Sequence, residues 1–98
     1  MAIKVDPEER EVAALRRVAN WDGTRVLEIG CGDGRLTLRL AGLGARVLGL
    51  DPDRLLIGKA REDLPKRYLR QVSYSVGSAS KLRYRAGSFD IVVFAWSL

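Results

Sequence analysis

The stretch that decides the fold is residues 26–37, Val26-Leu27-Glu28-Ile29-Gly30-Cys31-Gly32-Asp33-Gly34-Arg35-Leu36-Thr37. Its first four residues are apolar except for Glu28, which predicts a short buried strand. Glycines follow at positions 30, 32 and 34, and the apolar residues after them take helical spacing. A strand that enters a glycine-rich turn and then a helix is how an α/β sheet builds a nucleotide pocket. The stretch therefore predicts a site for a nucleotide-like ligand.

The spacing of the glycines narrows the choice of ligand. The dinucleotide fingerprint G-x-G-x-x-G places its third glycine five residues after the first. Arg35 stands at that position here, which disfavours a nicotinamide dehydrogenase. A phosphate-binding P-loop needs Lys followed by Ser or Thr after its glycines, and no such pair follows. The motif alone leaves a generic tight turn between strand and helix as an alternative.

The order acidic-x-G-x-G-x-G, which starts at Glu28, resembles motif I of the class I methyltransferases that use S-adenosylmethionine. Leu48-Gly49-Leu50-Asp51 is similar to the acidic end of the second strand in that family. Gly77-Ser78-Ala79 is similar to the segment that flanks the adenine, and residues 88–93 resemble the fourth strand. The resemblance covers nearly the whole chain and implies S-adenosylmethionine as the cofactor.

The resemblance also implies which residues bind the cofactor. They are Glu28, Gly30, Cys31, Gly32, Asp51, Pro52, Ser78 and Ala79. The motif I residues would hold the methionine part, through the backbone in the case of Cys31, and Ser78-Ala79 would lie against the adenine. Family members often carry Asp where this chain has Ser78, which weakens the expected contact to the adenine amino group.

Asp51 ends the second predicted strand, 21 residues after Gly30. A carboxylate there can accept charge-assisted hydrogen bonds from both ribose hydroxyls. Its alternative is a helix cap before Pro52, although Asp53 is also available to cap. The alternative for Glu28 is a structural role, as a partly buried acid tied to nearby amides. Cys31 is either a thiol of lowered pKa beside helix amides or, as we favour, a small residue in backbone contact.

The remaining pattern predicts an α/β, Rossmann-like open parallel sheet flanked by helices. We expect helices over 7–20 and 34–41 and a third that begins at Asp53 and is stopped by Pro65. Strands are expected over 26–29, 45–50, 71–76 and 89–96. Right-handed crossovers place these four strands in the order 3-2-1-4, with the ligand crevice between strands 1 and 4. Residues 1–5 are expected to be a loosely held lead-in, and Trp21 a packing anchor.

Composition bounds the function. The 98 residues predict one small domain over 1–98, and the absence of histidine excludes catalysis that depends on it. The single cysteine gives neither a disulfide nor metal-ligand spacing, and no residue is assigned as catalytic. No apolar run approaches membrane-spanning length, and we expect a cytoplasmic protein. The net charge of +5 is compatible with nucleic acid, but a solvated basic face is favoured.

The sequence stops at Leu98, whereas the family domain continues for three more strands. We therefore expect the cofactor-binding half of a truncated methyltransferase fold, with an acceptor site that requires segments beyond residue 98. The alternative is a non-catalytic cofactor-binding or oligomerising module. Strand 89–96, apolar on both faces, would be a sheet edge, which predicts a homodimer through antiparallel pairing of two copies. No residue specifies the methyl acceptor.

Overall fold

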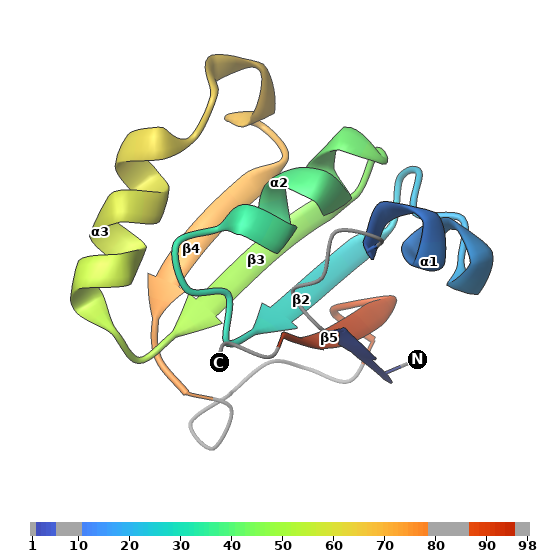
Figure 1. Ribbon diagram of the computed structural model, residues 1–98, viewed down its shortest axis with the longest axis horizontal. Helices are drawn as coiled ribbons and strands as arrows, with labels where there is room; N and C mark the ends of the chain where they lie inside the picture. Colours follow the sequence, from blue (N-terminus) through green and yellow to red (C-terminus); the bar gives the residue numbers. More distant parts are fainter. Residues whose placement is uncertain (1, 6–10, 79–86, 96–98) are drawn as a thin grey trace.

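The computed structural model describes residues 2–5, 11–78 and 87–95. These ranges form a parallel sheet with helices packed against it (Figure 1). In chain order the elements are β1 (Ala2–Val5), α1 (Glu11–Val18), β2 (Arg25–Ile29), α2 (Arg35–Gly42), β3 (Arg46–Asp51), α3 (Arg54–Asp63), the 3-10 turn η1 (Lys66–Tyr68), β4 (Val72–Val76) and β5 (Ile91–Ala95).

The order of the strands is β1-β5-β2-β3-β4, and all neighbours are parallel. The four strands predicted from the sequence are β2, β3, β4 and β5. The predicted order 3-2-1-4 is therefore confirmed as β4-β3-β2-β5, and the bounds of these strands agree with the prediction within two residues. The predicted start of the first helix, at Pro7, lies outside the described residues.

The expectation that residues 1–5 form a loose lead-in is wrong. β1 pairs with β5, from Ala2 opposite Val92 to Val5 opposite Ala95. Because β5 has β2 on one side and β1 on the other, it is not an edge of the described sheet. An apolar strand with an open side pairs with an available extended segment, and here that segment comes from the same chain. The predicted homodimer assumed that β5 is an unpaired edge strand, and in the structure β1 occupies that side of β5.

One face of the sheet carries the helices. The register places Val26 opposite Val47 and Ile91, and Val47 opposite Val72, so these side chains share a face. One buried cluster on this face joins α1 and α2 to β2, β3 and β5, and a second joins α2 and α3 to β4. The described helices therefore cover this face of the sheet.

Trp21 lies between α1 and the start of β2. Its side chain is 2% exposed, and its Nε1–H donates to the Leu15 carbonyl oxygen at 2.8 Å. The turn that follows uses Gly23 in the left-handed region at φ 72°, a conformation that side chains disfavour. The predicted role of Trp21 as a packing anchor is confirmed.

Candidate functional site

The loop between β2 and α2 takes the shape that its glycines predict. Gly30, Gly32 and Gly34 all have positive φ, at 81°, 56° and 89°. Gly30 also lies against β5, where an added Cβ would be 2.9 Å from the Ala95 carbonyl oxygen. Any larger residue at position 30 would push the loop away from the sheet. The glycines therefore place the loop directly over the carboxyl ends of β2 and β5.

Hydrogen bonds join this loop to the end of β3. The amides of Gly30 and Cys31 both donate to the Leu50 carbonyl oxygen, at 2.8 and 3.0 Å. The Gly32 amide donates to Asp51 Oδ2 at 2.9 Å, and the Gly34 amide to the Cys31 carbonyl oxygen at 3.0 Å. The amides of Gly30, Cys31 and Gly32 therefore have acceptors at the end of β3, because β3 ends beside the loop.

Asp51 lies at the carboxyl end of β3 and is 7% exposed. Its Oδ2 accepts from Gly32 and its Oδ1 accepts from the Asp53 amide at 2.9 Å. A carboxylate has about four acceptor positions, so these two bonds fix its orientation and leave acceptor capacity. The helix cap itself is Asp53, whose Oδ1 accepts from the Leu55 and Leu56 amides at 2.9 and 3.2 Å. The alternative role of Asp51 as the side-chain cap is thereby taken by Asp53.

Glu28 lies beneath the loop rather than on its surface. Its side chain is 0% exposed, and Oε1 accepts a hydrogen bond from Thr37 Oγ1 at 2.5 Å. Burial of a carboxylate is unfavourable unless donors compensate it, and the Thr37 hydroxyl is one such donor. Glu28 is thus a fully buried acid with the Thr37 hydroxyl as a donor. A role in cofactor binding would act through the loop above it.

Cys31 is a packing residue in this loop. Its side chain is 6% exposed, and burial, with smaller effects from the Glu28 and Asp51 carboxylates, raises the pKa of the thiol. The alternative of a lowered pKa is therefore wrong, because burial outweighs the nearby amides. Gly49 provides the space, since an added Cβ there would be 2.9 Å from Cys31 Sγ.

The end of β4 reaches the same rim. The Gly77 amide donates to the Asp51 carbonyl oxygen at 3.0 Å, which places half-buried Ser78 one residue beyond. Pro52 is exposed beside Asp51, and Ala79 lies outside the described residues. The structure thus brings the glycine loop, Asp51 and Ser78 together at the carboxyl ends of the strands.

Sequence reasoning missed Thr37 and Tyr74. Thr37 is 0% exposed and lies among the apolar residues on the buried side of α2. Tyr74 is 7% exposed and shares a row across the sheet with Glu28, since Gly49 is opposite both. A hydroxyl within an apolar helical stripe is the signal in the sequence that could have indicated a buried polar contact.

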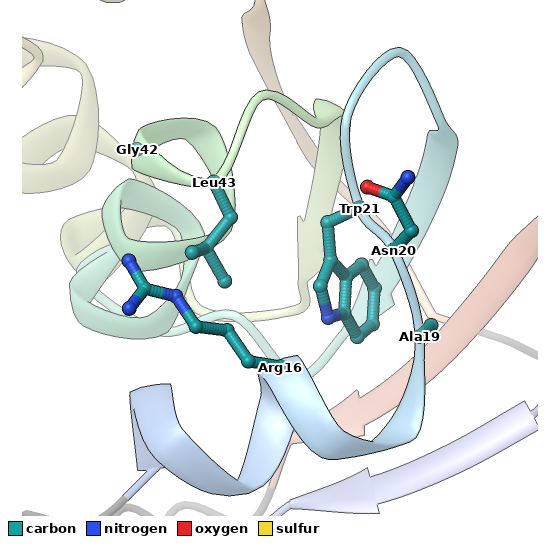
Figure 2. A pocket seen from close by; sticks show the side chains of 6 residues that line it. All are labelled: Arg16, Ala19, Asn20, Trp21, Gly42 and Leu43. Atoms are coloured by element: carbon teal, nitrogen blue, oxygen red, sulfur yellow. The ribbon is translucent and has the colours of Figure 1, made fainter.

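A hollow of about 490 Å³ lies at the opposite end of the sheet (Figure 2). It is lined by Arg16, Ala19, Asn20, Trp21, Gly42 and Leu43. Gly42 and Leu43 are at the carboxyl end of α2, and Trp21 precedes β2. The hollow is therefore near the amino ends of the strands, away from the glycine loop. Ligands of open α/β sheets bind at the carboxyl ends, so we assign the candidate site to the loop.

In residues 2–5, 11–78 and 87–95, no three acidic, histidine or cysteine side chains are grouped so that they could hold a metal ion. The helices within the same ranges are too short or too polar to cross a membrane.

The fold and the loop define a nucleotide-binding α/β domain, in which a glycine-rich turn follows one strand and an acidic residue ends the next. The chain belongs to the methyltransferase domain family, whose model matches residues 26–98.

A curated relative and two solved structures locate the chain within this family. It is 36% identical over 91 residues to an uncharacterised methyltransferase of Synechocystis, covering 92% of this chain and 41% of the relative. An S-adenosylmethionine dependent methyltransferase from Mesorhizobium loti superposes with a TM-score of 0.77 at 25% identity. This match covers 93% of this chain and 41% of that protein. Magnesium protoporphyrin IX methyltransferase from Synechocystis, with bound SAM, superposes with a TM-score of 0.71 at 28% identity. This match covers 85% of this chain and 39% of that protein. The chain thus spans about two fifths of the length of these proteins.

Proposed function

We propose that this chain binds S-adenosylmethionine along the rim formed by the glycine loop, Asp51 and the end of β4. It would serve as the cofactor-binding half of a class I methyltransferase, with residues 1–98 as one domain. The observation that carries the proposal is the loop of positive-φ glycines bonded through Gly32 to the carboxylate of Asp51. A solved relative that superposes on this part of the fold holds SAM.

In this proposal the loop and Asp51 divide the cofactor between them. The backbone of Gly30, Cys31 and Gly32 would line the methionine part, with Glu28 supporting the loop from below. The remaining acceptor positions of Asp51 would take the ribose hydroxyls, beside Pro52. Ser78, with Ala79 next to it in the sequence, would lie against the adenine.

S-adenosylmethionine would supply a sulfonium methyl group that is already activated for in-line transfer. The chain's own contribution would be to position this group and to keep water away from it. We assign no general base to this chain, and we propose that binding of the methyl acceptor needs residues beyond those present here. A non-catalytic cofactor-binding module is the second candidate.

Calorimetric titration tests the ligand. The 98-residue chain should bind S-adenosylhomocysteine and not NAD. Asp51→Asn should weaken binding by about 1.5–3 kcal/mol, the worth of a hydrogen bond to a charged group. The matched control is Asp63→Asn, an exposed carboxylate at the end of α3, which should bind as wild type does. Binding of NAD alone would contradict the proposal.

The cellular location and the self-association of the chain stay predictions. A cytoplasmic location is the first, and fractionation of cells expressing the chain would test it. Self-association is the second, and it would need a surface other than the far side of β5, since β1 is paired there. Sedimentation equilibrium of the purified chain would test the second.

A further inference from the structure

Tyr74 lies under the glycine loop because two glycines make room for it. In β3, Gly49 stands opposite Tyr74, and an added Cβ on Gly49 would be 3.0 Å from Tyr74 Cδ1. At the far end of the ring, an added Cβ on Gly34 would overlap with Tyr74 Oη. The ring therefore crosses β3, and its hydroxyl occupies the space of a side chain at the start of α2.

The hydroxyl of Tyr74 is buried and, within the described ranges, forms no hydrogen bond. Burial raises the pKa of Tyr74 to about 12, and the neighbouring Thr37 hydroxyl has a smaller effect that lowers the pKa. The phenol is therefore a neutral donor at physiological pH. The Thr37 hydroxyl donates its hydrogen bond to Glu28 Oε1, so Thr37 Oγ1 can only accept hydrogen bonds from other groups. A donor without a partner thus lies next to an oxygen that can accept.

The loop connects this pair to the cofactor rim. Gly32 is bonded to Asp51, and the Gly34 amide is bonded to the Cys31 carbonyl oxygen. A ligand that engages Asp51 and the loop therefore acts on Gly34, whose lack of a side chain leaves the space that Tyr74 Oη occupies. A small shift of the first turn of α2 would change the separation between Tyr74 Oη and Thr37 Oγ1.

We propose that Tyr74 is a positioning residue for the cofactor loop, and that its hydroxyl donates to Thr37 Oγ1 when the cofactor binds. This inference rests on the proposed function. The new bond would complete a buried chain from Tyr74 through Thr37 to the Glu28 carboxylate. An unpartnered buried hydroxyl is unfavourable, so the Tyr74 hydroxyl does not stabilise the ligand-free protein. The hydroxyl would add to cofactor affinity and not to the stability of the free protein.

The test compares two tyrosines in the full 98-residue chain. Tyr74→Phe removes only the hydroxyl, and Tyr68→Phe is the matched control, a half-buried tyrosine of η1 that packs beside Gly42. Affinity for S-adenosylhomocysteine is measured by calorimetry, and the Tm is measured without ligand. Tyr74→Phe should weaken binding about two- to twelve-fold, the effect of one neutral hydrogen bond, with a Tm equal to or above that of wild type. Tyr68→Phe should leave the affinity unchanged.

The outcomes separate this inference from the function on which it rests. If wild type binds no S-adenosylhomocysteine, the proposed function and this inference both fail. If wild type binds and Tyr74→Phe binds equally well, only the inference fails. A Tyr74→Phe protein with a lower Tm, or one that does not fold, would show that the hydroxyl stabilises the free protein, and this too would overturn the inference.

Discussion

Replacing Thr37 with valine removes a hydrogen bond to a buried carboxylate at nearly constant side-chain volume. Thr37 and Glu28 are both 0% exposed, and the two oxygens are 2.5 Å apart. Because the shape is conserved, the loss is that of the bond and not of a cavity. A hydrogen bond to a charged group contributes about 1.5–3 kcal/mol, and we expect the free energy of unfolding to fall by about this amount. For a domain of this size it corresponds to a Tm lower by about 6–24 °C.

Urea unfolding followed by tryptophan fluorescence measures this loss, and Thr24→Val provides the comparison. The Thr24 hydroxyl donates to the neutral Trp21 carbonyl oxygen at 2.6 Å and is only partly buried. Its removal should cost about 0.5–1.5 kcal/mol. If Thr37→Val were no more destabilising than Thr24→Val, the reasoning that Glu28 depends on Thr37 would be refuted.

A double-mutant cycle isolates the contact further. In Glu28→Gln the charge is removed and the shape is kept, so Thr37→Val should cost less in that background than in wild type. Residues in direct contact show coupling energies of about 0.5–3 kcal/mol. Additive losses would mean that the two side chains act on stability independently.

Two further predictions follow from ionisable groups. Since burial raises the pKa of Cys31, its thiol should react slowly with a disulfide reagent at pH 8 in the folded protein and quickly in urea; fast reaction of the folded chain would contradict this. Hydrogen bonds from the Arg25 side chain and backbone lower the pKa of Asp90. The stability that the ionised carboxylate contributes is complete above the pKa of Asp in the unfolded chain and is lost as the pH falls through the lowered pKa. Below the ordinary pKa of an aspartate, about 3.9, the Tm of wild type should therefore fall more steeply than that of Asp90→Asn, and parallel curves would argue against the pairing.

The sequence predicts the parts of this fold that depend on local pattern. The positive-φ glycines at 30, 32 and 34, the Asp53 cap and the parallel order of β2 to β5 all follow from spacing and from the handedness of crossovers. Each of these features depends on residues that are close together in the chain or on a general rule of topology.

The features that the sequence did not predict depend on distant contacts. β1 pairs with β5 across some 90 residues, and four residues without a turn signal give no hint of this partner. The occupied loop amides depend on where Leu50 and Asp51 come to lie. The Tyr74 ring reaches Gly34 only because the residue opposite Tyr74 in β3 is Gly49, which has no side chain to block the ring. Such packing is fixed by the assembled sheet and not by any local pattern.

We propose that the cofactor binds at the glycine loop and not in the hollow between α1 and α2. Titration of S-adenosylhomocysteine into the isotope-labelled chain, followed by amide nuclear magnetic resonance, distinguishes the two places. We expect shifts for the amides of the loop, Asp51 and Ser78, with little change at Asn20 and Leu43. Shifts confined to Asn20 and Leu43, or none at all, would contradict it.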